Sequence, residues 1–281
     1  MQYRHRFHAG TFADIHKHVT LLALLTALKR KDAGFLYLET HAGRGCYDLA
    51  HPSTESSRAA HASLAQLASA APGAFELTSY LAHLQRLRAR LESSHAYPGS
   101  PLFAAQELRP QDRAVLIEIV PSEARALERE LRGYPRMHVE AADGFAALRA
   151  YLPPPERRSL TFIDPPYEER EDFKLVAAAC VAALGRFRSG IVAAWYPIKD
   201  ARTTSAWQSA LAGALDCETL VSEWWLYPRD SRVALNGSGL LILNPPYQFA
   251  MQMQLWLAEL HALFNTAGSG GMSIRTLTVQ G

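Results

Sequence analysis

Apolar residues along the chain follow two alternating patterns, helical spacing and short continuous runs. The first helical pattern begins at the Thr-Phe-Ala-Asp sequence of residues 11–14, which has the form of a capping box, and Gly34 ends it. Apolar runs of strand length lie at residues 35–39, 114–119, 138–141, 160–163, 191–195 and 240–243. Segments of helical length lie at residues 122–132, 145–152, 171–184, 201–215 and 249–264. Strands that alternate with helices predict an α/β fold with a mostly parallel sheet, covered by helices on both faces.

One segment, residues 53–97, interrupts this alternation. It is rich in Ala, Ser and Leu and has no strand pattern. An apolar stripe at helical spacing runs through its second half: Leu77, Leu81, Leu84, Leu87 and Leu91. We therefore expect a helical insertion subdomain at 53–97, within a main domain formed by residues 1–52 and 98–281.

Composition narrows the class of protein. A chain of 281 residues with 48% hydrophobic and 20% charged residues is long enough for a large core. The apolar run at residues 19–28 is too short to span a membrane. The Arg and His residues among the first eight positions do not fit a signal peptide. Three distant cysteines in no ligand spacing predict a cytoplasmic protein without disulfides or structural zinc. The formal charge of +2 permits a nucleic-acid partner but does not indicate one.

Three consecutive predicted strands end in polar or glycine-rich tips. A Thr-His-Ala-Gly-Arg-Gly turn at residues 40–45 follows the first, Glu118 ends the second, and Asp143-Gly144 closes the third. Open α/β sheets bind ligands at this edge, where glycine lets the backbone approach, Glu118 could hold ribose hydroxyls and Asp143 could accept from an adenine amine. Singly, a tight turn or a helix-capping acid explains each feature as well. The residues after Gly45 lack the full G-x-G-x-x-G of a dinucleotide dehydrogenase.

The fourth strand ends in Asp164-Pro165-Pro166-Tyr167, the most specific signal from the residues themselves. The exocyclic amine of adenine or cytosine is a poor nucleophile, because its lone pair is delocalised into the ring. Asp164 can accept one amine hydrogen and take the proton, and the rigid carbonyl of Pro165 can accept the other. Tyr167 offers a ring on which an extruded base can stack. This pattern predicts methylation of a base amine; a strand that ends in a proline turn with an aromatic plug is the structural alternative.

A second tetrapeptide, Asn244-Pro245-Pro246-Tyr247, follows a later strand and has the same form. Asn offers a carbonyl acceptor but no base. Strand order favours Asp164, which lies beside the first strand, and we expect Asn244 at the far side of the sheet.

With these motifs in view, the chain closely resembles the RlmJ family, bacterial methyltransferases that modify an adenine of 23S ribosomal RNA at N6, the family target being the adenine at position 2030. The resemblance runs almost from end to end. It rests on sequences at residues 3–10, 13–14, 17–18, 40–43, 97–101, 142–145, 163–167, 195–197 and 239–246. It implies a Rossmann-like class I S-adenosylmethionine-dependent methyltransferase sheet with helices on both faces and a small helical insertion. The chain departs from the family pattern at Thr11-Phe12, where Asn-His is usual.

The resemblance also assigns site residues. It implies contact with S-adenosylmethionine by six residues: His18, His41, Ser100, Glu118, Asp143 and Gly144. It makes Asp164 the proton acceptor and places Tyr3 against the RNA. From the residues alone, His18 would be taken for a core-edge residue. Lys17 would be taken for a solvated charge, or for a ligand of a cofactor carboxylate or RNA phosphate.

Two rival functions remain open at this stage. A DNA adenine-N6 methyltransferase shares the Asp-Pro-Pro-Tyr chemistry, and a catalytically inactive RNA-binding module could use the same fold. The N-terminal histidines lack a metal-ligand pattern, so no metal is expected. We expect a monomer with 23S rRNA as its partner. Trp195, Trp224 and Trp225 are interpreted as packing residues.

Overall fold

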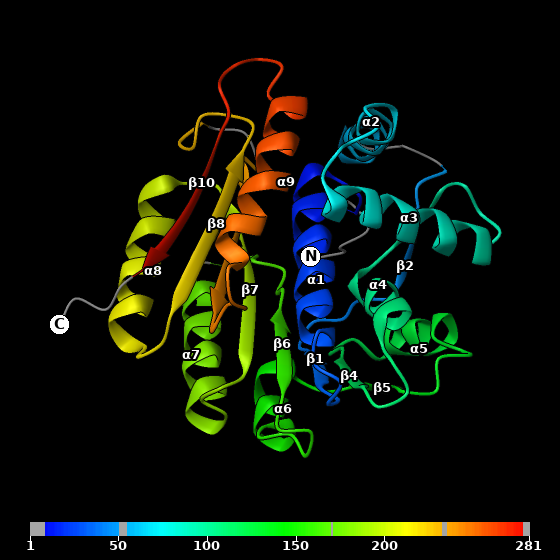
Figure 1. Ribbon diagram of the computed structural model, residues 1–281, viewed down its shortest axis with the longest axis vertical. Coiled ribbons are helices and arrows are strands. Elements are labelled where there is room, and N and C mark those ends of the chain that lie inside the picture. Colours follow the sequence, from blue (N-terminus) through cyan, green and yellow to red (C-terminus); the bar gives the residue numbers. More distant parts are fainter. Residues whose placement is uncertain (1–8, 51–54, 170, 232–234, 278–281) are drawn as a thin grey trace.

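The central feature of the protein is a single large sheet with helices on both faces (Figure 1). The computed structural model describes residues 9–50, 55–169, 171–231 and 235–277. The sheet has eight strands in the order β10-β8-β9-β7-β6-β1-β4-β5. Their bounds are β1 Leu36–Glu39, β4 Arg113–Ile117, β5 Met137–Glu140, β6 Ser159–Ile163, β7 Ile191–Ile198, β8 Thr219–Trp225, β9 Gly237–Leu243 and β10 Gly271–Leu277.

The sheet is mixed, and its two halves differ in direction. Neighbouring strands from β5 to β7 pair in parallel, whereas the pairs β7–β9, β9–β8 and β8–β10 are antiparallel. The predicted α/β class is confirmed, but the expectation of a mostly parallel sheet holds for the first half only. Neither β8 nor β10 was predicted, because polar residues interrupt the apolar run of each strand. In β8 these are Ser222 and Glu223, and in β10 they are Ser273, Arg275 and Thr276.

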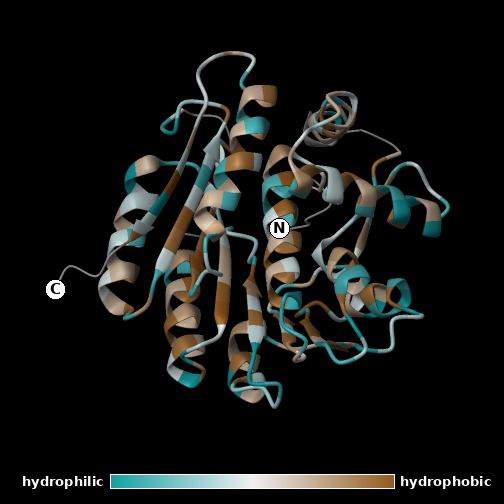
Figure 2. Cartoon of the chain, in the orientation of Figure 1, coloured by the Kyte–Doolittle hydropathy of each residue, from teal (hydrophilic) through white to brown (hydrophobic). Residues whose placement is uncertain are grey.

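Helices cover the sheet in two layers, each with its own core. One layer contains α1 Phe12–Lys29, α2 Glu55–Ser69, α3 Phe75–Arg90, α4 Ser100–Glu107, α5 Pro121–Glu130 and α9 Phe249–Phe264. The other contains α6 Gly144–Tyr151, α7 Glu171–Arg186 and α8 Ala201–Ala214. Alternate side chains of one strand enter the two cores, as Tyr37 and Leu38 do. Figure 2 shows apolar residues concentrated on the central strands and along α1. No described helix is long and apolar enough to cross a membrane.

Helix α1 lies over the middle of the sheet, between α9 and α4 (Figure 1). Thr11 is its N-cap, as predicted, but forms no side-chain capping bond with a described residue. Instead Asp14 Oδ2 accepts a hydrogen bond from Gly10 N at 2.8 Å, one residue earlier than a capping box requires. The helix ends at Lys29 with Arg30 as its C-cap, so Gly34 belongs to the connection to β1.

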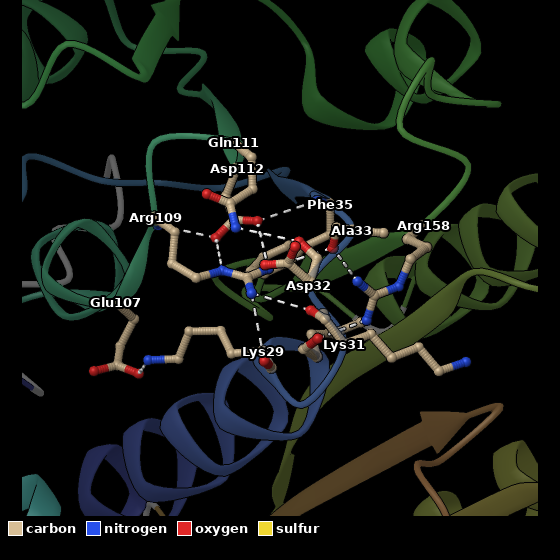
Figure 3. A network of polar contacts seen from close by, with 11 residues as sticks. Lys29, Lys31, Asp32, Ala33, Phe35, Glu107, Arg109, Gln111, Asp112 and Arg158 are labelled. Atoms are coloured by element: carbon tan, nitrogen blue, oxygen red, sulfur yellow. Dashed lines mark hydrogen bonds and ion pairs between the residues drawn. The ribbon is translucent and has the colours of Figure 1, made fainter.

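Polar contacts at the amino edge of the sheet anchor the end of α1 (Figure 3). Arg109 Nε donates to the buried carboxylate of Asp112 at 2.9 Å and its Nη1 to Lys31 O at 3.0 Å. Arg158 Nη2 donates to Leu28 O at 2.6 Å. Because these contacts hold the last turn of α1 at the amino edge, its first turns lie at the carboxyl edge of the parallel strands.

The expected insertion, residues 53–97, contains two helices, α2 and α3. A small antiparallel pair, β2 Cys46–Asp48 and β3 Ala96–Pro98, closes its base, with Gly99 N donating to Gly45 O at 2.7 Å. Leucines of both helices enter the same core as α1. The division of the chain into a main domain and a 53–97 subdomain therefore stays a prediction.

Candidate functional site

The predicted site residues gather at the carboxyl ends of the parallel strands. Asp164 follows β6, and β6 pairs with β1, which ends at Glu39. Thr40 N donates to Phe162 O at 3.0 Å, so the turn after β1 stays in register beside the end of β6. Glu118 and Asp143 follow the next two strands on the other side of β1.

Lys17 of α1 holds the carboxylate of Asp164. Its Nζ lies 2.6 Å from Asp164 Oδ2 and 2.7 Å from Asp14 Oδ1, and its side chain is 3% exposed. Burial alone would lower the pKa of Lys17, but the carboxylates of Asp14 and Asp164 outweigh it and raise the pKa above its usual range. A permanently charged ammonium thus bridges two acids at the centre of the site. The contact between Lys17 and RNA stays a prediction, since two carboxylates use two of the three N–H donors of the ammonium.

A further carboxyl group, Glu39, lies fully buried at the end of β1. Ser100 Oγ donates a short hydrogen bond to its Oε1, and Tyr37 Oη donates to its Oε2 at 2.9 Å. Burial, opposed by these two hydrogen bonds, raises the pKa of Glu39 to about 8. Ser100, a predicted cofactor residue at the start of α4, is therefore held against β1 through Glu39.

The glycine turn after β1 contacts the second predicted acid. Gly43 has φ +64°, and its N–H donates to Glu118 Oε2 at 2.8 Å. Glu118 Oε1 accepts from Val120 N, also at 2.8 Å. A Cβ on Gly43 would lie 2.5 Å from the hydroxyl of Tyr47, so the turn needs glycine both for its backbone conformation and for space.

Asp143 and Gly144 bring the end of β5 against the same turn. Asp143 Oδ1 caps α6 by accepting from Phe145 N at 2.9 Å and Ala146 N at 3.2 Å. A Cβ on Gly144 would lie 1.9 Å from Thr40 O, which no side chain tolerates. Gly144 therefore allows the backbone after β5 to approach the backbone after β1.

Of the two predicted histidines, His18 lies in α1 and His41 lies within this turn. His18 is buried, with Nδ1 2.8 Å from the hydroxyl of Tyr97 and its ring 4.9 Å from that of Phe103. His41 Nδ1 lies 2.8 Å from Thr40 Oγ1. Burial lowers the pKa of His41 to about 4, against the nearby carboxylates of Asp164 and Asp143, so this ring is neutral near pH 7.

Two residues of the tetrapeptide, Pro165 and Tyr167, are buried. Tyr167 has φ +51° and is 4% exposed, and its hydroxyl donates to Trp195 O at 2.6 Å. Its ring lies between Phe173, with centroids 4.8 Å apart, and Trp195, at 5.8 Å. The arrangement resembles the aromatic plug of the structural alternative, and stacking of a base on Tyr167 stays a prediction.

The second tetrapeptide lies at the opposite edge of the sheet. Because β9 runs antiparallel to β7, Asn244 falls beside the start of β7, where its Nδ2 donates to Arg188 O and Gly190 O at 2.8 Å. An open pocket of about 580 Å³ lies at this edge, and it is lined by Phe187, Arg188, Ser189, Asp216, Cys217 and Asn244. Asn244 is thus remote from Asp164, as strand order predicted, although three strands and not two separate them along the chain.

The structure brings the described members of the predicted set to one edge of the sheet. Tyr3 lies outside the described residues. Three contributors were not predicted: Asp14 and Glu39, which contact Lys17 and Ser100, and Trp195, whose ring lies 5.5 Å from Lys17 Nζ. A charged residue that ends an apolar strand was the available signal for Glu39. Within the described part of the chain, no group of three or more His, Cys, Asp or Glu side chains is arranged to hold a metal ion.

Known proteins resemble this chain over almost its whole length. Residues 32–278 match a family described as "Ribosomal RNA large subunit methyltransferase D, RlmJ". Two curated relatives carry the name "Ribosomal RNA large subunit methyltransferase J". The Escherichia coli protein is 36% identical over 274 residues, covering 98% of each chain. The Haemophilus influenzae protein is 33% identical over 278 residues, covering 99% of each.

A solved structure shares the fold as well as the sequence. The crystal structure of a Legionella pneumophila protein superposes with a TM-score of 0.85 at 35% sequence identity. The match covers 96% of this chain and 98% of that one. The fold described above is therefore common to related sequences.

Proposed function

The chain belongs to the RlmJ family of ribosomal RNA large subunit methyltransferases, and from that premise we propose that it methylates the N6 amine of an adenine in 23S rRNA, with S-adenosylmethionine as donor. One observation carries the proposal from the chemical side. Asp164 precedes Pro165-Pro166-Tyr167 beside the glycine turn after β1, and its carboxylate is held by the buried ammonium of Lys17.

The residues around the β1 turn fit S-adenosylmethionine by their chemistry. The cofactor carries a ribose diol and an adenine amine, which require acceptors, and a compact backbone turn leaves room for it. Glu118 and Asp143 are carboxylates at the ends of β4 and β5, and side chains on Gly43 or Gly144 would collide with their surroundings. We propose that these residues hold the cofactor with His18, His41 and Ser100. When bound, the cofactor supplies an electrophilic methyl group.

Asp164 and Pro165 act on the amine of the target base. Lys17 binds Asp164 Oδ2, so Oδ1 can accept one amine hydrogen, while the carbonyl of Pro165 accepts the other. These two acceptors turn the nitrogen lone pair toward the donor. Asp164 then takes the proton that the amine loses, and correct placement of such a base contributes roughly 10²–10⁴-fold to the rate. The contact between Asp14 and Lys17 fixes the direction from which the ammonium approaches.

The geometry of Asp164 does not separate RNA from DNA, since both carry adenine. A DNA methyltransferase and an inactive RNA-binding module remain the alternatives, and the intact Asp164–Lys17 pair argues against inactivity. Tyr3 and the surface of α2 and α3 are our candidates for RNA contacts. We further propose that the protein acts in the cytoplasm as a monomer without a metal.

The proposal is tested by nucleoside mass spectrometry of rRNA from a strain without this gene. One N6-methyladenosine should disappear from 23S rRNA and return on complementation. An unchanged rRNA profile would contradict the proposal. Purified protein given a 23S rRNA transcript and duplex DNA in parallel should methylate the transcript; methylation of the DNA alone would favour the DNA enzyme.

A further inference from the structure

A surface rich in exposed arginines lies beside the glycine turn of the site. It is formed by the last turns of α3 and the outer face of α5, which lie on the same side of the molecule (Figure 1). The five exposed arginines that define this arginine surface are Arg86, Arg90, Arg125, Arg129 and Arg132. Two exposed acids, Glu92 and Glu128, accompany them. The surface thus has an excess of three positive charges, whereas the whole chain has a formal charge of +2.

One arginine joins the two segments of the arginine surface. Arg90 Nη2 donates to Arg132 O at 2.6 Å, and the Arg90 guanidinium lies 4.0 Å from the centroid of the Tyr134 ring. A Cβ on Gly133 would lie 3.8 Å from the same guanidinium. The end of α3 is therefore held against the turn after α5, and the arginines of both helices form one continuous surface.

The spacing of these arginines is unfavourable for the helices themselves. Arg86 and Arg90 are four residues apart in α3, and the three arginines of the α5 segment follow one another at intervals of four and three residues. Like charges at these spacings lie on one face and destabilise a helix. Because the row costs stability, its positive charge points to an anionic partner outside the chain.

The type of cation indicates which anion fits. All five residues are arginines, whose planar guanidinium presents several N–H donors in a fixed arrangement. This arrangement matches two oxygens of one phosphate group, whereas lysine offers only a point charge. A polymer with a phosphate at each repeat is therefore the partner that suits a row of exposed arginines.

The arginine surface is continuous with the glycine turn of the site. A Cβ on Gly45 would lie 2.8 Å from Leu127 Cδ1, so the turn packs directly on α5. Arg44 Nε of the same turn lies 3.8 Å from Oε2 of Glu123, in the first turn of α5. An RNA chain that presents a base to Asp164 can therefore continue over α5 on the same side of the protein.

We propose that the arginine surface binds the phosphate backbone of 23S rRNA at nucleotides other than the target. The inference rests on the proposed function, which identifies the polyanion as this RNA. Contacts to phosphates fix the position and register of a nucleic acid and do not read its sequence. The arginine surface thus holds the RNA, while selection of the adenine belongs to the site around Asp164.

The salt dependence of binding measures such contacts directly. Fluorescence anisotropy gives the Kd of the full-length protein for a labelled 23S rRNA transcript between about 50 and 200 mM salt. Each phosphate contact that is removed should lower the slope of log Kd against log salt concentration by about 0.7–0.9. Arg125→Gln/Arg129→Gln and Arg86→Gln/Arg129→Gln should therefore each lower the slope by roughly 1.4–1.8.

The matched control is Arg149→Gln/Arg157→Gln. Both arginines are exposed, Arg149 in the last turn of α6 and Arg157 just before β6, so they lie at the edge of the sheet opposite Asp164. This variant loses the same charge and should keep the wild-type slope. Arg125→Lys/Arg129→Lys retains both charges and should also keep the slope, although its affinity should be lower because the guanidinium fork is lost.

Kinetics supply the second readout. Both variants of the arginine surface should raise KM for the transcript by about tenfold or more, with kcat and the Kd for S-adenosylmethionine within about twofold of the wild type. Their melting temperatures should not fall, because Arg125→Gln/Arg129→Gln removes a repulsive pair and Arg86 is exposed. If one of the two variants does not fold, the other decides.

Two results would overturn the inference: a wild-type slope in both variants of the arginine surface, or an equal loss of slope in the Arg149→Gln/Arg157→Gln control. Failure of the proposed function looks different. In that case the wild-type protein would leave the 23S rRNA transcript unmethylated, whatever residues stand on α3 and α5.

Discussion

Lys17 Nζ and Asp164 Oδ2 lie 2.6 Å apart, although 147 residues separate them along the chain. Asp14, one turn before Lys17, completes a buried group of one cation and two anions. Removing one partner of a buried ion pair leaves the other charge without compensation, which costs more than the intact pair contributes. The group therefore makes both the fold and the placement of the carboxylate depend on Lys17.

We predict that Lys17→Met lowers the free energy of unfolding by about 3–5 kcal/mol and reduces methyl transfer at least tenfold. Chemical denaturation and turnover of a labelled rRNA transcript check the two effects. Lys29→Met is the matched control on the same helix, because Lys29 pairs with Glu107 away from the site and is 27% exposed. Lys29→Met should lower the free energy of unfolding by about 1 kcal/mol or less and leave kcat unchanged. Equal effects of the two substitutions would argue against a special role for Lys17.

Glu39→Gln should change how stability depends on pH. Because the folded pKa of Glu39 is raised to about 8 from 4.5, its contribution to stability is complete below pH 4.5 and is lost progressively as pH rises from 4.5 to about 8. Wild-type stability should therefore fall relative to that of the variant between pH 4.5 and about pH 8, by up to roughly 3–5 kcal/mol. Urea denaturation at both pH values measures it. Parallel pH profiles for the two proteins would mean that Glu39 ionises normally in the fold.

Gly144→Ala should weaken the site without touching a predicted acid. The new methyl group would meet Thr40 O at 1.9 Å and push the β5 and β1 ends apart, at a cost of about 1–3 kcal/mol. We expect a lower melting temperature and weaker binding of S-adenosylmethionine by calorimetry. Gly213→Ala, in α8 with nothing within 4 Å of its Cβ, is the control and should stabilise by about 0.5–1 kcal/mol. Unchanged cofactor affinity in Gly144→Ala would mean that this approach of the two backbones does not shape the cofactor site.

Asn244→Ala should leave methyl transfer intact despite the Asn-Pro-Pro-Tyr sequence. The substitution removes two hydrogen bonds at the opposite edge of the sheet and places Ala at φ +52°. It should cost about 1–2 kcal/mol of stability. Activity per folded molecule, measured on the rRNA transcript, should equal that of the wild type. A loss comparable to that of Asp164→Ala would require a second active centre at that edge.

Local sequence patterns were sufficient to predict the strands whose ends carry the site residues. The strands β1, β4, β5, β6 and β7 are short apolar runs with polar or glycine ends, and each was predicted near its observed position. The β8 strand was missed because Glu223 is fully buried within it, where Arg229 and Arg275 pair with its carboxylate. A local sequence pattern cannot predict that an acidic residue is buried in a strand when the basic residues that pair with it lie in other segments.

The site itself was predicted as a list of residues and not as an arrangement. Asp164, Glu118 and Asp143 were identified because each ends a strand, and strand ends meet at one edge. The bridge formed by Lys17 and the buried state of Tyr167 depend on how α1 and α7 pack over the sheet. Trp195 was interpreted as a packing residue, and it packs against both cores; its position 5.5 Å from Lys17 Nζ was not predicted.

The most direct test of the account is N6-methyladenosine formation in a 23S rRNA transcript by wild-type protein and by Asp164→Ala. Nucleoside mass spectrometry after complete digestion detects the product, and calorimetry measures the affinity of each protein for S-adenosylmethionine. The account predicts one N6-methyladenosine per transcript with the wild type, and a rate lower by roughly 10²–10⁴-fold with Asp164→Ala at similar cofactor affinity. Methylation by Asp164→Ala at the wild-type rate, or a wild-type product other than N6-methyladenosine, would contradict it.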